Sequence, residues 1–384
     1  RSSAMSEPFF ARIRLPEGRR FDAAEVTRLV AGLPALAPCG PSVLMAGRLT
    51  AMLSPGGGEV QMQYTARGLA EQGVRVRFWR PWEERLAEAD VVHLFGSQRE
   101  HLPLVHEARR RGLAVVLSPI TWFDWRSLWR EPWPMRRRVA ACAKFWLRSA
   151  APMLPSWRRE LYQACNLLLP NSAAEAEQLV RYFGVDPRRI HVVVNGADER
   201  FAHGDGRLFA RRAGGFHFVL YSGRIEPRKN QLGFLQAMRG TNVPIVILGD
   251  PVPGHEAYHA ACRRVAGDNV RFLPRIEHDD PLLASAYAAC GCLVLASWYE
   301  TPGLVALEAG MSGVPLVLPA AGCTREYFGP LAEYVHPTDH AEIRTKVLAA
   351  LGRPRSPELA AKVREHYSWQ AACRATRDAY ATLL

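Results

Sequence analysis

The 384-residue sequence lacks the features of a membrane-spanning or disulfide-stabilised protein. No segment is long and apolar enough to cross a bilayer, and no signal peptide follows the first residues. The eight cysteines are scattered and include no C-x-x-C pair, which fits a reducing compartment better than a disulfide framework. Asp-x-Asp pairs, internal repeats and low-complexity tracts are also missing. We therefore expect a cytosolic protein that is long enough for two domains with substantial cores.

Short apolar runs alternate with amphipathic segments along most of the chain. This alternation predicts strands joined by crossover helices, and therefore parallel, doubly wound α/β sheets. The runs form two series, which predicts two Rossmann-like domains facing each other across a cleft, with residues 195–215 as the linker. Expected helices include Phe21–Leu36, Val60–Gln72 and Ala173–Phe183. The expected strands are Ser42–Ala46, Val74–Phe78, Val91–Phe95, Ala114–Leu117, Asn166–Leu169 and His191–Val194 in the first series, and Phe216–Ser222, Pro244–Gly249, Val270–Leu273, Cys292–Ala296, Leu316–Leu318 and Glu333–Val335 in the second.

The stretch Leu295–Pro319 predicts the most informative unit of the chain, a strand, a loop, a helix and a second strand. Thr301 is a good N-cap, Pro302 suits the first helical position, and Gly313 suits the position after the helix end. We therefore expect a helix of about three turns between the two strands.

The start of this helix has the residues of a phosphate-binding site. The first helical residues, Pro302, Gly303 and Leu304, carry no bulky polar side chain, so the free N–H groups there favour an anion, most simply a phosphate. We therefore expect Thr301, Gly303 and Leu304 to contact the substrate. Carboxylates lie on both sides, Glu300 before the cap and Glu308 within the helix, and a carboxylate accepts hydrogen bonds from sugar and ribose hydroxyls. A phosphate site between two hydroxyl acceptors describes a nucleotide-sugar pocket.

The spacing Glu300-x7-Glu308 resembles the signature of the retaining glycosyltransferases of family 4, which have the GT-B fold. Two more segments support the resemblance. Residues 222–230 look like the family's Gly-Arg…Lys phosphate-binding loop, and residues 322–326 look like its Gly-x-x-x-Glu turn. Matching segments cover most of the chain. The resemblance implies an acceptor-side domain over residues 1–205, a nucleotide-sugar-binding domain over 206–368, and a terminal helix over 369–384 that crosses back to the first domain.

The resemblance also implies roles for individual side chains. Arg224 and Lys229 follow a strand at the carboxyl edge of the second sheet, where ligands of open α/β sheets bind. There they would neutralise the leaving diphosphate without a metal, and Glu300 would orient the transferred sugar. Glu308 would bind the ribose. We expect Arg228, between the two basic residues, to be a solvated side chain.

Two further segments complete the expected donor site. Gly57 and Gly58 belong to a glycine run whose missing Cβ atoms let the backbone approach a ligand closely. In the family this loop faces the donor phosphates from the opposite domain, although a plain turn is an alternative. Arg275 and Ile276 follow a strand where the family contacts the nucleotide base through its backbone.

The sequence departs from the family pattern on the acceptor side. Family members carry a His in a stretch like Thr-x-His-Asp, and it contacts the transferred sugar. The corresponding residues 118–124 contain no His, so Thr121, Asp124 or His93 would have to substitute. This departure motivates an alternative function, a non-catalytic module that binds nucleotide sugars.

A second alternative comes from the sequence His255-Glu256-Ala257-Tyr258-His259. This H-E-x-x-H run on a predicted helix is the pattern of zinc metalloproteases, with two His on one face and Glu256 as the base. No third ligand stands out at a recognisable spacing, so a surface helix face is the simpler interpretation. We expect no metal and no other cofactor, with the nucleotide sugar as a co-substrate.

The segment Trp122–Arg159 holds six of the ten tryptophans, and its nine basic and two acidic residues supply +7 of the chain's net charge of +12. Clustered Trp and Arg suit an anionic membrane surface or a lipid-linked acceptor. Internal packing against the first domain is an alternative. A groove for nucleic acid is a third one, but no nucleic-acid motif is visible and we expect no such partner.

These observations together predict a retaining glycosyltransferase, of hexosyltransferase type, that uses a nucleoside diphosphate sugar such as a UDP- or GDP-sugar. The acceptor would be a glycan or a lipid-linked molecule in cell-surface polysaccharide or lipopolysaccharide biosynthesis. The enzyme would be cytoplasmic, and peripheral on the inner face of the cell membrane if residues 122–159 bind lipid.

Overall fold

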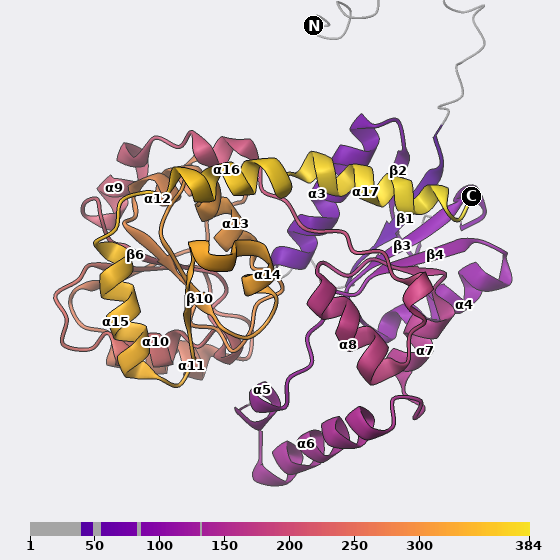
Figure 1. Ribbon diagram of the computed structural model, residues 1–384, viewed down its shortest axis with the longest axis horizontal. Coiled ribbons are helices and arrows are strands. Elements are labelled where there is room, and N and C mark those ends of the chain that lie inside the picture. The colour runs from indigo at the N-terminus through magenta and orange to yellow at the C-terminus, as the bar shows by residue number, and fades with distance from the viewer. Residues whose placement is uncertain (1–39, 49–54, 83–85, 131–132) are drawn as a thin grey trace, which may run out of the picture. The chain divides into compact units, whose positions relative to one another are not determined.

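The computed structural model describes residues 40–48, 55–82, 86–130 and 133–384, of which Pro41–Leu384 form one compact unit (Figure 1). The helix expected at Phe21–Leu36 lies outside these residues. Within the described ranges, none of the helices combines the length and the hydropathy needed to span a bilayer. Two parallel sheets with helices on both faces form the architecture, as the sequence predicts.

The first sheet has the strand order β2-β1-β3-β4-β5, with every pair parallel. Its central strands are buried because helices cover both faces, and this explains their continuous apolar sequences. Side chains alternate between two layers: Val43 and Met45 pack with one set of helices, and Leu44 packs with the other. The strands are β1 Ser42–Ala46, β2 Arg75–Phe78, β3 Val91–Phe95, β4 Ala114–Ser118 and β5 Leu167–Leu168. The helices of this part are α3 Gly57–Glu71, α4 Leu102–Arg110, α5 Trp125–Arg130, α6 Met135–Ala150, α7 Trp157–Ala164 and α8 Ala173–Phe183.

The second sheet has the order β11-β10-β9-β6-β7-β8 and is also parallel throughout. Its strands are β6 Val219–Ser222, β7 Ile245–Leu248, β8 Val270–Leu273, β9 Cys292–Val294, β10 Leu316–Pro319 and β11 Glu333–Val335. Around it lie α9 Gly206–Ala213, α10 Gln231–Ala237, α11 Glu256–Val265, α12 Pro281–Ala289, α13 Leu304–Met311, α14 Thr324–Phe328, α15 His340–Leu351 and α16 Pro357–His366.

One predicted strand is wrong. Residues 191–194 do not form a strand, although the chain follows β5 for a short distance. The N–H of His191 donates to the carbonyl of Leu168, and the N–H of Val193 donates to that of Pro170. Because β5 has only two residues, the pairing ends there. The apolar run 191–194 then leaves the sheet, and its own residues are partly exposed.

Helix α13 also differs from its prediction. It begins at Leu304 rather than at Pro302 and has eight residues, about two turns instead of three. The N-cap is Gly303, with φ of 85°, a left-handed conformation that favours glycine. This bend moves the helix start past Thr301. The predicted stop is right, because Gly313 follows the C-cap with φ of 70°.

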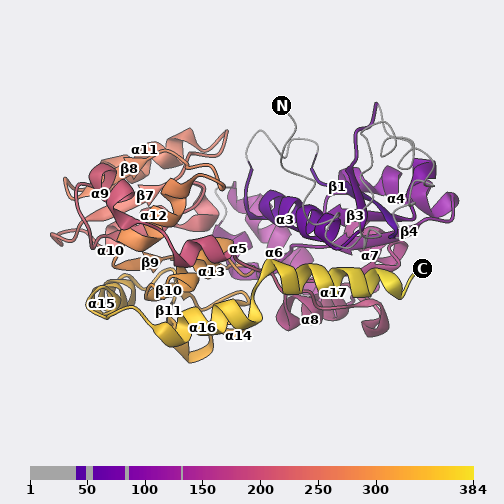
Figure 2. The ribbon, with the colours of Figure 1, turned by 90° about the horizontal axis from the view of Figure 1, so that it is seen from above.

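The chain passes between the two sheets twice, and the two passages lie side by side. Ala197, in the first passage, forms a parallel bridge with Ser368 in the second, and its N–H donates to the carbonyl of Tyr367 at 2.8 Å. The passages touch closely, since a Cβ built on Gly196 would lie 2.3 Å from the backbone nitrogen of Trp369. After the second passage, α17 (Trp369–Ala381) packs along α3 (Figures 1 and 2). The boundary between residues 205 and 206 stays a prediction.

Candidate active site

A cavity of about 870 Å³ lies between the carboxyl ends of strands from both sheets, the usual ligand position in open α/β folds. Loops after β1 and β4 line it on one side, and segments after β6, β8 and β9 line the other. The structure brings all the residues that we placed in the donor site to this one cavity: Gly57, Gly58, Arg224, Lys229, Arg275, Ile276, Glu300, Thr301, Gly303, Leu304 and Glu308.

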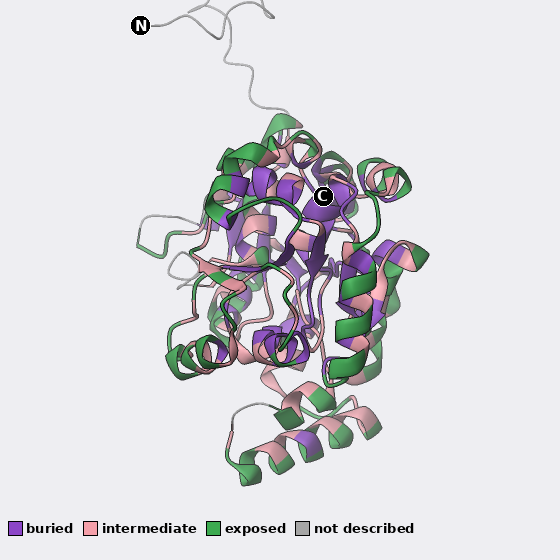
Figure 3. Cartoon of the chain, turned by 90° about the vertical axis from the view of Figure 1, so that its left-hand side faces the viewer, coloured by how far each residue is buried: buried purple, intermediate pink, exposed green. Residues whose placement is uncertain are grey.

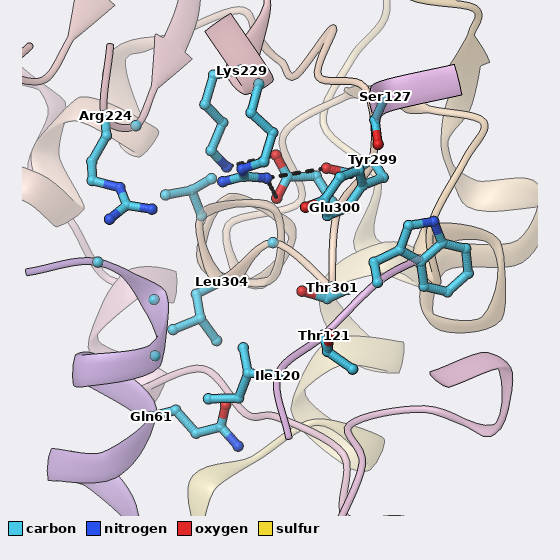
Figure 4. A pocket seen from close by; sticks show the side chains of 18 of the residues that line it. Gln61, Ile120, Thr121, Ser127, Arg224, Lys229, Tyr299, Glu300, Thr301 and Leu304 are labelled. Atoms are coloured by element: carbon cyan, nitrogen blue, oxygen red, sulfur yellow. Dashed lines mark hydrogen bonds and ion pairs between the residues drawn. The ribbon is translucent and has the colours of Figure 1, made fainter. Parts of the chain in front are cut away.

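Glu300 is the centre of a buried charge network (Figure 4). Its Oε1 atom accepts hydrogen bonds from Lys229 Nζ and from Ser297 Oγ, both at 2.6 Å, and Arg228 lies 4.0 Å from Oε2. Burial raises the pKa of the Glu300 carboxyl, but Lys229 and Arg228 outweigh this effect and hold the pKa below its usual value. Glu300 is therefore a carboxylate whose position is fixed by three partners.

The expectation that Arg228 is a solvated side chain is wrong. Its guanidinium pairs with Glu226 at 3.0 Å, donates to the carbonyl of Tyr299 at 3.3 Å and lies over the Tyr299 ring. The partners Tyr299 and Glu300 come from a loop some 70 positions along the chain, so the local pattern around Arg228 carried no signal for these contacts.

Arg224 lies opposite the glycine loop of the first sheet. A Cβ built on Gly56 would come within 3.2 Å of Arg224 Cζ, and one on Gly57 would contact Leu304 Cδ1 at 3.7 Å. Gly56 is the N-cap of α3, so Gly57 and Gly58 form the first turn of that helix. The closeness of Gly56 to Arg224 and of Gly57 to Leu304 shows why the loop needs small residues.

Two helix N-termini thus open into the cavity, those of α3 and α13. Among the described residues, the N–H groups of Leu304 and Val305 at the start of α13 have no backbone or side-chain acceptor. Free N–H groups and the helix dipole favour negative charge, and Arg224 adds a full positive charge beside Gly56 at the start of α3. The arrangement can hold a diphosphate.

Glu308 is held by two residues that our sequence reasoning did not identify. Its Oε1 atom accepts from His278 Nε2 at 2.8 Å, and its Oε2 atom accepts from Tyr287 OH at 2.6 Å. Arg200 is always a donor, and its guanidinium lies 3.1 Å from His278 Nδ1. Nδ1 therefore accepts, which places the ring proton on Nε2. Both oxygens of Glu308 retain a lone pair that can accept a further hydrogen bond.

Of the three candidates to replace the missing His, Thr121 and Asp124 line the cavity and His93 does not. His93 is buried, with Nδ1 2.6 Å from Tyr380 OH and Nε2 3.0 Å from Ser118 Oγ. Burial lowers the pKa of His93 to about 3, so the ring is neutral. His93 joins α17 to the first sheet, which is a structural role.

The H-E-x-x-H run lies outside the cavity lining, at the start of α11. Glu256 accepts from the N–H of Gly254 at 2.9 Å, and His259 packs edge-on against Phe272. No cluster of three or more His, Cys, Asp or Glu side chains suited to a metal is present in the part of the chain that the structure describes. The geometry therefore favours the surface-helix interpretation of this run.

Comparisons with known proteins identify the family of this chain. Residues 55–201 match the family described as Glycosyltransferase Family 4, and residues 210–366 match Glycosyl transferases group 1. D-inositol 3-phosphate glycosyltransferase from Streptomyces bingchenggensis is 31% identical over 247 residues, which cover 58% of this chain and 54% of the relative. The chain spans about half the length of the curated relatives it matches.

Solved structures share the fold at low identity. Sucrose-phosphate synthase from Thermosynechococcus elongatus has a TM-score of 0.71 at 16% identity, over 89% of this chain and 99% of that one. Anabaena HepE in complex with UDP and glucose has a TM-score of 0.65 at 17% identity, over 89% of this chain and 100% of that one. The two family matches together cover most of the chain, from Pro55 to His366, and the architecture agrees with them. The chain belongs to the glycosyltransferases of family 4, with the GT-B fold.

Proposed function

We propose that this protein is a retaining glycosyltransferase that takes a sugar from a nucleoside diphosphate sugar. The observation that carries the proposal is the single cavity in which two helix N-termini, Arg224 and Lys229 converge between the carboxylates Glu300 and Glu308. These are the groups that a diphosphate, a sugar and a ribose need.

In the proposed reaction, the bond between the anomeric carbon and the diphosphate oxygen breaks while the acceptor oxygen attacks from the same face. The acceptor proton passes to the departing phosphate oxygen, so no protein nucleophile is required. Arg224, Lys229 and the N-terminus of α13 stabilise the negative charge that develops on the diphosphate. Glu300, fixed by Lys229 and Ser297, orients the sugar hydroxyls.

This division of roles needs no metal, because two cationic side chains and two helix ends supply the positive charge. Activity should therefore survive excess EDTA. Complete loss on EDTA treatment, with recovery on adding zinc or magnesium, would contradict the proposed roles of Arg224 and Lys229.

A UDP-sugar is our first candidate donor, because HepE, which shares the fold, was solved with UDP and glucose. A thermal-shift screen against UDP, GDP, ADP and dTDP tests the donor base, and release of the nucleoside diphosphate from the matching sugar donor tests catalysis. Binding without turnover, even with a range of acceptors, would favour the non-catalytic module instead.

For the acceptor we propose a glycan or a lipid-linked molecule of cell-surface polysaccharide or lipopolysaccharide synthesis, reached at an anionic membrane. Helix α6 supports this proposal, since its outward face is apolar and its flanks are basic. Met135, Val139, Trp146 and Leu147 are 50–59% exposed, and they lie within about 120° of one another around the helix. The lower part of Figure 3 shows α5 and α6 with mostly exposed and half-exposed residues. An apolar stripe with flanking cations is the pattern of a helix that lies in a membrane surface.

Vesicle binding tests this part of the proposal. The protein should sediment with anionic vesicles at low salt and be released as salt rises, because each Lys or Arg near the surface contributes about 1 kcal/mol. Replacing Arg136, Arg137 and Arg138 by Ser should abolish this binding and leave nucleotide affinity unchanged, because none of the three lines the cavity. A matched control replaces three exposed arginines of α9, namely Arg207, Arg211 and Arg212. A parent protein that ignores anionic vesicles at low salt would refute membrane docking.

A further inference from the structure

The cavity continues past the donor residues into a chamber formed by α6, α7 and α8. Its walls combine aromatic rings with basic side chains, a lining unlike that of the donor half. Lys144 and Arg148 come from α6, and Arg158 comes from α7. The aromatic members of this chamber are Phe123, Trp133, Phe145, Trp157, Tyr182 and Phe183.

Aromatic faces, rather than carboxylates, hold the two guanidinium groups. Arg158 Cζ lies 4.3 Å from the centroid of the Trp157 ring and 5.6 Å from that of Phe123. Arg148 Cζ lies 5.2 Å from the centroid of Phe183, and one of its nitrogens donates to the carbonyl of Leu154 at 3.2 Å. A ring engages the flat face of a guanidinium and leaves the N–H groups at its edge available.

Arg158 in particular has unused donors. Its Nε atom is inaccessible to solvent and has no hydrogen-bond partner, and the side chain forms no ion pair with any residue that the structure describes. Arg158 is half-buried in the cavity wall, so the terminal N–H groups of its guanidinium remain available to an anion in the chamber.

The groups around Arg148 and Arg158 do not neutralise the positive charge of the two side chains. Burial lowers the pKa of Arg158, and the nearby groups that oppose this effect are the phenols of Tyr162 and Tyr299 rather than carboxylates. Burial also lowers the pKa of Arg148, and the like charges of Arg158 and Arg159 lower it further. The carboxylate of Asp124, at the same cavity, is occupied by the N–H groups of residues 126 and 127 at the start of α5.

The chamber adjoins the donor site through one residue. Tyr299 precedes Glu300 in the chain and lies under the guanidinium of Arg228. It is also close enough to Arg158 to raise the pKa of that side chain. An anion bound by Arg158 would therefore lie in the same cavity as Tyr299 and Glu300.

We propose that Arg158 and Arg148 form a phosphate subsite for the acceptor, so that the acceptor of this enzyme carries a phosphate or diphosphate group. The inference rests on the proposed glycosyltransferase function and names the substrate class for it. Planar guanidinium groups match the oxygen geometry of phosphate and can bind it through paired hydrogen bonds. The aromatic rings around them suit either the faces of a sugar or the first isoprene units of a lipid. A free sugar phosphate and a lipid-linked sugar diphosphate share this chemistry.

Calorimetry with matched probes tests the subsite, first with the protein saturated with UDP and then without nucleotide. Glucose 6-phosphate represents a free sugar phosphate, farnesyl diphosphate represents a lipid-linked one, and glucose, glucuronate and farnesol are the controls. We expect at least one phosphorylated probe to bind at least about tenfold more tightly than its unphosphorylated control, because its hydrogen bonds are charge-assisted. The phosphorylated probe that binds more tightly identifies the source of the phosphate.

Variants then connect the binding to the two arginines. Arg158→Gln and Arg148→Gln should each lower the affinity for the phosphorylated probe at least about tenfold while leaving UDP affinity unchanged. Arg158→Lys keeps the charge and should recover part of the loss. The matched control is Arg67→Gln, since Arg67 is an exposed residue of α3 outside the cavity lining.

The outcomes separate this inference from the proposed function. If UDP binds but phosphorylated and control probes bind alike, or glucuronate binds as tightly as glucose 6-phosphate, the phosphate subsite is refuted and the donor site stands. An unchanged probe affinity in both Gln variants refutes it equally. If no nucleoside diphosphate binds, the proposed function fails, and the titrations without nucleotide still decide whether the arginines bind phosphate.

Discussion

Replacing Glu308 by Gln should weaken nucleotide binding without unfolding the protein. His278 can only donate to position 308, because Arg200 already donates to its Nδ1 atom. The Gln oxygen must therefore face His278, and the amide NH₂ group must face Tyr287. The Tyr287 hydroxyl can rotate to accept from that amide, so the packing survives. The side that faces Tyr287 then changes from an ionised acceptor to a donor.

The expected loss follows from that single change. One charge-assisted hydrogen bond to a ribose hydroxyl contributes about 1.5–3 kcal/mol, which corresponds to roughly 10- to 150-fold in Kd. Stability should change by only about 1 kcal/mol, because each protein partner keeps one hydrogen bond. Calorimetric titration of the nucleoside diphosphate chosen by the thermal-shift screen measures the first quantity, and urea unfolding measures the second.

A ligand without ribose hydroxyls provides the control. The 2′,3′-dideoxy form of the same nucleotide should bind the parent protein and Glu308→Gln equally well, since it offers nothing for position 308 to accept. Equal affinity of parent and variant for the ribonucleotide would remove Glu308 from the ribose site. An equally large loss with the dideoxy form would show that the substitution acts through the structure instead.

Three more predictions concern buried charge and backbone strain. Lys229→Met should lower the free energy of unfolding by about 3–5 kcal/mol, measured with urea, because it leaves the Glu300 carboxylate buried without its partner. Adding Glu300→Gln should recover much of that loss. A double variant as unstable as the single one would contradict this. Gly303→Ala should lower the free energy of unfolding by about 1–3 kcal/mol, since a φ of 85° strains any other residue, and it should also weaken nucleotide binding. The control is Gly73→Ala, at a φ of 84° with no atom within 4 Å of the added Cβ, which should lower stability without changing nucleotide binding. Burial raises the pKa of Glu175 to about 7 from 4.5, its ordinary value, so the folded state holds the proton more tightly. The contribution to stability is complete below pH 4.5, and about 3 kcal/mol is lost as pH rises to 7 and above. Melting curves from pH 4 to 8 should show this decline in the parent and lack it in Glu175→Gln; parallel curves would refute it.

Strands and the overall topology could be predicted because the signal for them is local. An apolar run such as Val91–Phe95 is buried on both faces of its sheet, and its ends coincide with the ends of the strand. The start of α13 could not be placed in this way. Thr301 and Pro302 are good residues for a helix start, and only the left-handed backbone at Gly303, which depends on its packing against Glu300, moves that start to Leu304.

Motif spacing predicted which residues come together at the cavity, but it did not predict the partners of those residues. His278 and Tyr287 precede Glu308 by 30 and 21 positions, and nothing in the sequence between them indicates a contact. Arg158 shows the same limit. Its cluster is visible as a concentration of Trp and Arg, whereas its position at the cavity depends on how α6 and α7 fold back against the first sheet.

The paired passages at Ala197 and Ser368 determine how the cavity can change its width. A single flexible connection would let two bodies separate, slide and twist independently. Two backbone segments joined by a bridge, with Gly196 pressed against the start of α17, instead act as a narrow strap at one edge of the molecule. The remaining freedom is a swing about that strap, whose effect grows with distance from it. Parts of the cavity wall far from the strap would then move through longer arcs than parts beside it, so substrate entry and product exit would use the side of the cavity away from the strap.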